Sequence, residues 1–281
     1  MDELTKPLNS QANNLKSLVK SIRKIETEET DLLKRLSTLH DEIPRIEKQL
    51  QNLKFEQPLA AEITQGLLAW KEEAQELESR AKAAFGRELE QLLIEHGYSL
   101  EGNYPKLKTS FYTIIVDINL NRVTLYYGPE IEKIASCAIL PATVCEKILK
   151  YDAILAERVL DEDVFLANLF DAYSVCLHRL NKRIGAEVSI PDILSTYAFL
   201  TQDSKFIKNP TRANYREYNR AMLSYDLYSL KKRAVNKHEM VTITARRGET
   251  RNRYDTLWIP SPSGKGIGES ISGIKFREVI I

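Results

Sequence analysis

Leucine and isoleucine recur with alternating steps of three and four residues from Leu15 to Leu53. The positions are Leu15, Leu18, Ile22, Ile25, Glu29, Leu32, Leu36, Leu39, Ile43, Ile46, Leu50 and Leu53, and only Glu29 is neither Leu nor Ile. An apolar seam at this spacing predicts a helix that packs against another helix as a coiled coil. The sequence therefore predicts a chain that assembles, with a second copy or with another protein.

Two prolines and a second seam indicate how this region folds. Pro44 predicts a kink or break near Leu39–Ile43 within a first helix over residues 10–56, and Pro58 predicts its end. A second helical run reaches residue 96, and its seam is out of frame with the first: Ile63, Leu67, Trp70, Ala74, Leu77, Ala81 and Ala84. These features predict an antiparallel coiled-coil helical hairpin that turns near residues 54–60. A parallel dimer through the first helix is the alternative.

The rest of the chain mixes strand and helix patterns. Residues 110–119 and 121–128 are rich in β-branched and aromatic residues, which predicts an antiparallel β-hairpin. Helical periodicity predicts a central bundle with helices over residues 130–136, 142–158, 162–183, 191–201 and 211–233. Asp161 or Asp163, Ser189 and Asn209 are candidate helix starts. Residues 241–245 and 254–259 predict a C-terminal β-hairpin. The expected fold is α+β and mostly α, with a hairpin domain over 1–96 and a globular domain over 97–281.

Charge is distributed unevenly along the chain. Residues 205–281 hold 16 Lys/Arg and 7 Asp/Glu, a net charge of +9, while the other 204 residues hold 24 and 32, a net charge of −8. This asymmetry predicts an acidic body and a basic C-terminal region that contacts nucleic acid or an acidic protein.

Cysteine usage and the lack of long apolar runs indicate the compartment. Cys137, Cys145 and Cys176 match no zinc or redox spacing, so buried free thiols are expected. The sequence shows no apolar signal core at its start and no run of about 18 apolar residues. A cytoplasmic protein with no membrane partner is the expectation.

Basic residues supply the strongest candidate for a binding site. Arg212, Arg216 and Arg220 stand at i, i+4 and i+8 of the predicted helix over 211–233, so they would form one stripe with roughly 6 Å between neighbours. Further cations follow in three groups: Lys231, Lys232, Arg233 and Lys237; then Arg246, Arg247, Arg251 and Arg253; then Lys265 in the polar loop after Pro260. The set predicts contact with a DNA or RNA backbone. Salt bridges to an acidic protein or a solvated face are the alternatives.

Two weaker patterns point to a nuclease. The segment from Arg233 to His238 has the spacing R-x4-H and resembles the short motif of HEPN-type ribonucleases, in which an arginine and a histidine at a helix end act on the 2′-hydroxyl and the scissile phosphate. The resemblance covers six residues, and Ala234 replaces the usual polar residue. Asp117 with Glu130 or Glu132 is a candidate acidic set for a metal-dependent nuclease.

Taken together, these patterns predict a non-enzymatic accessory subunit of a cytoplasmic multiprotein complex. It would dock a protein partner or a second copy through the coiled coil and contact nucleic acid through the basic C-terminal region, with no metal and no cofactor. A ribonuclease or metal-dependent nuclease, and a purely structural coiled-coil adaptor that binds an acidic protein, are the alternatives.

Overall fold

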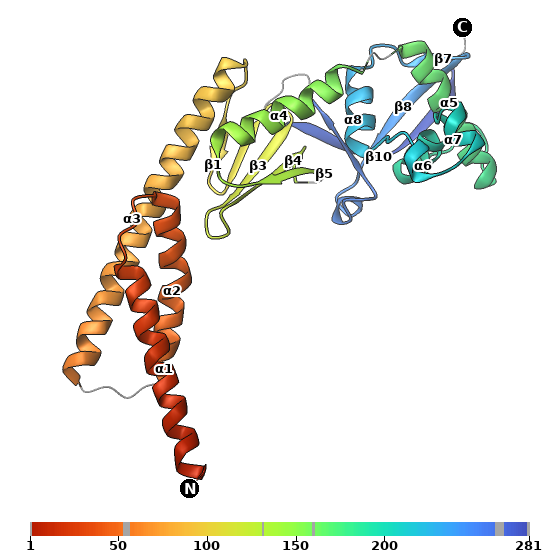
Figure 1. The fold of residues 1–281 in the computed structure, drawn as a ribbon. Coiled ribbons are helices and arrows are strands. Elements are labelled where there is room, and N and C mark those ends of the chain that lie inside the picture. Colours follow the sequence, from red (N-terminus) through yellow and green to blue (C-terminus); the bar gives the residue numbers. More distant parts are fainter. Residues whose placement is uncertain (1, 53–56, 131, 159–160, 262–266, 280–281) are drawn as a thin grey trace.

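Three helices form an arm on an α+β body in the computed structural model, which describes residues 2–52, 57–130, 132–158, 161–261 and 267–279 (Figure 1). The arm consists of α1 (Asp2–Glu26), α2 (Leu32–Asn52) and the first part of α3 (Gln57–Glu95). The body contains two antiparallel sheets and the remaining helices. The predicted α+β class is confirmed at this level. None of the described helices is both long and apolar enough to cross a membrane.

The apolar seam does not form one helix. It is divided between α1 and α2 by residues 27–31, and Glu29, its only polar member, lies in this break. The Glu29 carboxylate accepts a hydrogen bond from the backbone N–H of Asp31 (2.9 Å), and Asp31 Oδ1 accepts from the N–H of Lys34 (3.0 Å). Of the kink or break predicted near Leu39–Ile43, the break does not occur, because α2 continues through Pro44. No apolar residue anchors the chain between Ile25 and Leu32, so the helix ends there instead.

The seam residues are buried where the helices of the arm pack together. α1 packs antiparallel on α2, and α2 packs antiparallel on α3, which begins beyond residues 53–56 (Figure 1). The buried residues of this core are Leu18, Ile25, Leu36, Leu39, Ile43, Ile46, Leu67, Ala74 and Ala81. The arm therefore has three helices in place of the predicted two-helix hairpin. Of the predicted turn over 54–60, residues 54–56 lie outside the described ones and residues 57–60 belong to α3.

Two charged residues of α2 fix the register of the arm. Arg35 donates bidentately to Glu73 of α3 (2.7 and 2.8 Å) and also donates to the carbonyl of Ile25 at the end of α1. Glu42 is 3% exposed and accepts from Lys24 of α1 (2.5 Å) and from Arg45 (2.7 Å). Buried charges are tolerated only when they are paired in this way, so the two residues specify which helix faces which.

The first sheet is an antiparallel meander in the order β1 to β5. Its strands are β1 (Glu101–Asn103), β2 (Lys106–Thr109), β3 (Tyr112–Asp117), β4 (Arg122–Tyr127) and β5 (Glu132–Cys137). The predicted hairpin over 110–128 corresponds to β3 and β4. The helix predicted over 130–136 is wrong, because residues 132–137 pair with β4 as a strand.

The first sheet shares its core with two helices. α4 (Pro141–Ala156) and the last part of α3 cover it, and Phe85, Leu89 and Leu93 of α3 are buried against the sheet. α3 therefore belongs to the arm and to the body, and it enters the body before the predicted domain boundary at residue 96.

The second sheet has the C-terminal strand at its centre. The strands are β6 (Val188–Ser189), β7 (Ala234–Val235), β8 (His238–Thr244), β9 (Leu257–Pro260) and β10 (Gly268–Glu278). Ile271 of β10 pairs with Thr244 of β8 and with Leu257 of β9, so these two strands lie on opposite sides of β10. The predicted hairpin between residues 241–245 and 254–259 is therefore wrong.

Four helices accompany this sheet, and one of them joins the two cores. They are α5 (Glu162–Arg179), α6 (Ile190–Leu200), α7 (Ser204–Lys208) and α8 (Arg220–Ser229). On α8, Ala221 is buried in the core of the first sheet, while Leu223 and Leu227 are buried in the core of the second. Ser224 of α8 also donates a hydrogen bond to the carbonyl of Trp258 (2.5 Å), which ties the helix to β9.

Candidate functional site

The predicted arginine stripe does not form. Arg212 lies in one turn of 3-10 helix, residues 215–219 have no regular structure, and α8 begins only at Arg220. The amide of buried Gln202 holds this segment, because it donates to the carbonyl of Arg216 (3.0 Å) and accepts from its N–H (2.8 Å). The predicted helix over 211–233 is confirmed only from Arg220 to Ser229, and the three arginines have three different environments.

Arg220 is a structural residue. Its side chain is 12% exposed, and its guanidinium donates to the carboxylate of Glu132 and to the carbonyls of Arg253 (2.9 Å), Tyr254 (3.0 Å) and Thr256. These contacts use most of the N–H donors of a largely buried guanidinium, so Arg220 is not a candidate phosphate contact. It instead holds the end of the loop that carries the next predicted arginines.

That loop, residues 245–256, is called the arginine loop below. It carries the predicted residues Arg246, Arg247, Arg251 and Arg253, all exposed. Its two acidic residues are bound within the loop itself. Glu249 accepts a hydrogen bond from the backbone N–H of Arg246 (2.7 Å), and Asp255 accepts one from the side chain of Asn252 (3.0 Å). Among the described residues, no carboxylate forms an ion pair with any of the four arginines. Lys265, also predicted, lies outside the described residues.

Arg233 and His238 lie on a β-hairpin and not at a helix end. β7 and β8 are joined by Asn236 and Lys237, which have positive φ angles of 48° and 62°, as a tight two-residue turn requires. The ring of His238 packs against Phe170 with 5.0 Å between ring centroids. The helical setting that the HEPN resemblance implies is therefore absent from this segment.

The predicted basic residues are divided between the two ends of β8. Lys231, Arg233 and Lys237 are exposed at its start, and the arginine loop follows its end. A seven-residue strand separates these ends by about 24 Å. The predicted site is thus two separate groups of cations.

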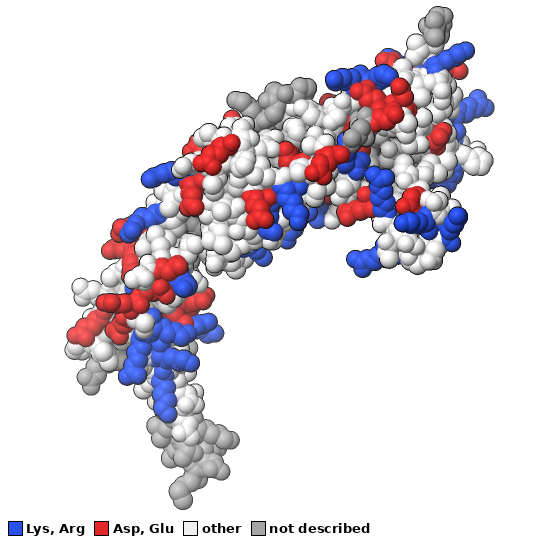
Figure 2. All heavy atoms as spheres, turned by 45° about the horizontal axis from the view of Figure 1, so that its top comes forward, with Lys and Arg blue, Asp and Glu red and all other residues white. Residues whose placement is uncertain are grey.

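Several cations of the basic C-terminal region pair with acidic residues elsewhere in the chain. Lys232 donates to Asp163 (2.8 Å), and Arg220 pairs with Glu132. On the face shown in Figure 2, positive and negative side chains are interspersed over the body. Folding therefore places part of the basic C-terminal region beside acidic residues of the rest of the chain, through Arg220 of α8 and through Lys232.

The acidic residues proposed for a metal-dependent nuclease have other roles. Asp117 accepts from the N–H of Leu120 (3.1 Å) in a turn, Glu130 pairs with Lys106, and Glu132 pairs with Arg220. Within the described ranges, no group of three or more His, Cys, Asp or Glu residues is placed to hold a metal ion.

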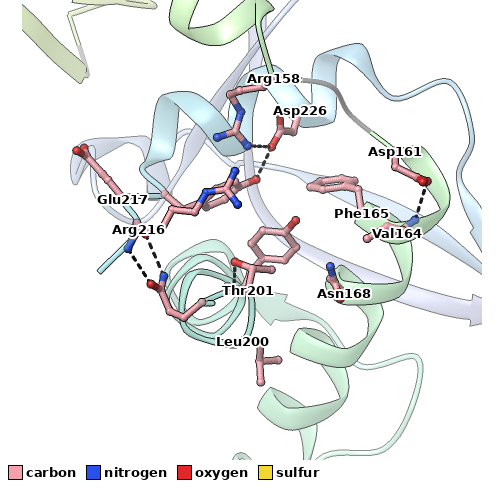
Figure 3. Close-up of a pocket in the computed structure, with 13 residues that line it drawn as sticks. Arg158, Asp161, Val164, Phe165, Asn168, Leu200, Thr201, Arg216, Glu217 and Asp226 are labelled. Atoms are coloured by element: carbon pink, nitrogen blue, oxygen red, sulfur yellow. Dashed lines mark hydrogen bonds and ion pairs between the residues drawn. The ribbon is translucent and has the colours of Figure 1, made fainter. Parts of the chain in front are cut away.

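A cavity that the sequence did not predict lies between α5, α6 and residues 216–218 (Figure 3). Its volume is about 440 Å³. The lining residues are Arg158, Asp161, Val164, Phe165, Asn168, Tyr197, Leu200, Thr201, Gln202, Arg216, Glu217, Tyr218 and Asp226. They combine two guanidinium groups, three carboxylates, three aromatic rings, and amide and hydroxyl groups.

A buried carboxylate organises one wall of the cavity. Asp226 is 2% exposed, and its Oδ2 accepts from Arg158 Nη2 (2.7 Å) and from the hydroxyl of Tyr218 (2.7 Å). The Arg158 guanidinium also lies over the Tyr218 ring, 5.0 Å from its centroid. Burial and the charge of Asp226 raise the pKa of Tyr218 well above its ordinary value, and burial, followed by the same charge, raises the pKa of Tyr197 to about 12. Both hydroxyls are therefore protonated donors near neutral pH.

The sequence offered one partial signal for this cavity. Arg216 was singled out for its spacing, but Arg158, Asn168 and Asp226 stand in separate segments with no shared motif. Their convergence depends on how α5, α6 and α8 pack around the second sheet, which no local pattern encodes.

Comparison of the chain with known protein families finds no match, and comparisons with curated proteins and with solved structures find none either. The functional proposals therefore depend on the geometry of this chain alone.

Proposed function

We propose that the protein is an accessory subunit that contacts nucleic acid through the arginine loop and assembles through its helical arm. The proposal of nucleic-acid contact depends on one observation. The guanidinium groups of Arg246, Arg247 and Arg251 are exposed and form no ion pair within the described chain. Exposed, unpaired arginines that cluster on one loop can each contact a phosphate and release a counterion.

The anchoring of the loop supports this role. Arg220 binds the carbonyls of Arg253, Tyr254 and Thr256, so the end of the loop is held against the first sheet. Arg253 lies over the ring of Tyr254, 4.8 Å from its centroid, and that ring is 56% exposed. An exposed ring beside arginines provides a surface on which an unpaired base can stack.

The test is a salt titration of nucleic-acid binding. Replacing Arg246, Arg247 and Arg251 together by alanine should weaken binding to single-stranded and duplex probes, and should reduce the slope of log K against log salt by about 2–3. The matched control removes three exposed cations elsewhere, Arg183, Lys205 and Lys208, and should leave the slope unchanged. No binding at low salt by the unmodified chain, or equal losses in both variants, would refute the proposal.

The assembly part rests on the outer face of α1. Leu15 and Val19 are 42% and 46% exposed, and Lys16, Lys20 and Arg23 surround them on the side opposite buried Leu18 and Ile25. Figure 2 shows Lys and Arg side chains gathered on the arm, with acidic side chains next to them.

The partner that this face fits best is a second copy of the chain. α3 holds eight Glu and four Lys/Arg, and its outer face presents Leu68, which is 57% exposed, with Glu72 one turn later. An exposed apolar residue with a carboxylate one turn away, on a helix rich in Glu, complements an apolar pair bordered by cations. We therefore propose that α1 of one copy packs against α3 of another.

A charge-swap experiment tests this contact. Replacing Lys16, Lys20 and Arg23 by glutamate should convert the assembly to single chains, as measured by light scattering. The control replaces Arg183, Lys205 and Lys208 by glutamate and should leave the assembly intact. Mixing the first variant with a chain that carries Glu72→Lys and Glu76→Lys should restore a paired species. A single-chain mass for the unmodified protein, or no rescue on mixing, would contradict the proposed contact.

A further inference from the structure

The cavity between α5, α6 and residues 216–218 has the size and the composition of a small-molecule site. Its volume of about 440 Å³ lies within the range of roughly 300–1,000 Å³ that ligand pockets occupy. It uses none of the residues proposed for the arginine loop or the arm, so a function here stands apart from the proposed function.

One of the two guanidinium groups that line the cavity has no ion-pair partner among the described residues. Arg158 is neutralised by buried Asp226, whereas the guanidinium of Arg216 forms no ion pair or hydrogen bond within the described residues. The two other carboxylates of the lining are engaged elsewhere. Asp161 caps α5 by accepting from two backbone N–H groups, and Glu217 accepts from Asn219 with its carboxylate turned away from the cavity (Figure 3).

The two guanidinium groups also have unused donors. Arg158 donates one hydrogen bond, to Asp226, and its Nε is buried without a partner in the described chain. Figure 3 shows Arg158 and Arg216 on one side of the cavity and Phe165 and Asn168 of α5 on the other. An anionic group seated beside both arginines would accept charge-assisted hydrogen bonds, which are stronger than neutral ones.

Aromatic rings line the cavity beside these cations. Phe165 and Tyr197 lie 5.5 Å apart between ring centroids, and Tyr197 and Tyr218 lie 4.8 Å apart. Phe165 and Tyr197 are 2% and 6% exposed, so they present only small parts of their rings to the cavity, against which a flat, unsaturated group can pack.

One amide is free to form hydrogen bonds with the edge of such a group. Asn168 is half-buried, and its side chain forms no hydrogen bond within the described chain. An amide presents a donor and an acceptor side by side, which is the arrangement that pairs with the edge of a nucleobase.

We propose that this cavity binds a nucleotide, with its phosphate at Arg216 and Arg158 and its base against Phe165, Tyr197 and Tyr218, within reach of Asn168. Inorganic phosphate would leave the aromatic wall uncovered, and an uncharged aromatic ligand would leave Arg216 unmatched. The nucleotide is either a free mononucleotide or the terminal nucleotide of a single strand, since both present the same base and phosphate.

Calorimetric titration of the full chain with the four 5′-mononucleotides tests the site, with adenosine and inorganic phosphate as partial ligands. At least one mononucleotide should bind about tenfold or more tightly than adenosine or phosphate alone, because each partial ligand lacks one of the two sets of contacts. A competing 5′-phosphorylated oligonucleotide identifies the source: displacement of the mononucleotide supports a strand end, and lack of displacement supports a free nucleotide.

Two variants tie the binding to these residues. Arg216→Ala should weaken mononucleotide binding about tenfold or more, since it removes a charge-assisted contact. Asn168→Ala should change the preference among the four bases. Arg212→Ala is the matched control, because Arg212 is exposed on the same segment and does not line the cavity, and it should bind as the unmodified chain does. No binding of any mononucleotide at about 1 mM, or unchanged affinity in Arg216→Ala, would overturn the proposal.

Discussion

Arg220 and Glu132 form an ion pair that joins the start of α8 to the edge strand of the first sheet. The same guanidinium donates to three carbonyls at the end of the arginine loop, so one side chain connects a helix, a strand and a loop. Arginine is suited to this position because its planar fork presents several donors in fixed directions.

Replacing Arg220 should therefore destabilise the body. Arg220→Ala leaves Glu132 and the loop carbonyls without their donor, and we expect a loss of about 2–3 kcal/mol in urea unfolding. Arg220→Lys keeps the charge but not the planar fork, so its free energy of unfolding should lie between those of Arg220→Ala and the unmodified chain. Proteolysis should also cut residues 245–256 faster in both variants. Arg212→Ala is the exposed control, and it should change the free energy of unfolding by less than about 0.5 kcal/mol. Equal unfolding midpoints for Arg220→Ala and the unmodified chain would contradict this role.

Glu42 should make the stability of the arm depend on pH. Burial raises the pKa of its carboxyl, but hydrogen bonds from Lys24 and Ser21 and the charges of Arg45 and Lys24 outweigh burial, so the pKa lies below its ordinary value. A lowered pKa in the folded state means that the carboxylate stabilises the arm above its unfolded pKa of about 4.3. This contribution is lost as the pH falls through the folded pKa.

Glu42→Gln tests that dependence. The variant should be less stable near neutral pH by about 1–3 kcal/mol, and its thermal midpoint should fall less steeply below about pH 5 than that of the unmodified chain. Helical circular dichroism across pH measures both effects. Glu62→Gln, at an exposed position of α3, is the control and should keep the unmodified profile. Parallel pH profiles for Glu42→Gln and the unmodified chain would count against the argument.

The break at residues 27–31 should depend on its polar residues. Glu29→Leu with Asp31→Ala restores the apolar seam and removes both hydrogen bonds that shape the turn, so α1 and α2 should merge into one helix. Spin labels at Ser17 and Gln49 report the change. These side chains are hydrogen-bonded at 2.6 Å in the hairpin, and a continuous helix would place the residues roughly 48 Å apart. Glu28→Leu is the control, because residue 28 is off the seam, and a short label distance in the double variant would refute the prediction.

The cysteines should be poorly reactive in the folded protein. Burial raises the pKa of all three thiols, and Cys176 also lies 3.1 Å from the hydroxyl of Thr196. Since the thiolate is the reactive form, a thiol reagent at neutral pH should label the native chain slowly and all three residues after denaturation. Half-buried Cys137 should react first, so Cys137→Ser should remove the leading phase. A fast-reacting thiol that persists in Cys137→Ser would contradict this expectation.

Local features of this fold were predictable and non-local ones were not. The hairpin of β3 and β4 follows from residue types and a short turn, and Asp161 and Ser189 cap α5 and α6 as their sequence contexts indicate. β5 was misassigned as a helix because its strand state comes from pairing with β4. Arg212, Arg216 and Arg220 have helical spacing in the sequence. The backbone at Arg216 is nevertheless not helical, because it is hydrogen-bonded to the side chain of Gln202, 14 residues earlier.

The candidate sites show the same division. The arginine loop was visible because its charges are adjacent in sequence and need only be exposed. The cavity was not visible, because Arg158 and Asp226 are 68 residues apart and meet only after α8 has packed between the two cores. Sequence spacing therefore located a basic segment and gave no indication of a concave site.

α3 gives the molecule a mechanical property. One helix of 39 residues, about 58 Å long, contributes Leu67 to the core of the arm and Leu93 to the core of the first sheet. It passes from one core to the other as continuous helix, with no flexible linker between them. A force applied at the far end of the arm is therefore delivered to β1–β5 as torque, and the arm acts as a stiff lever on the sheet.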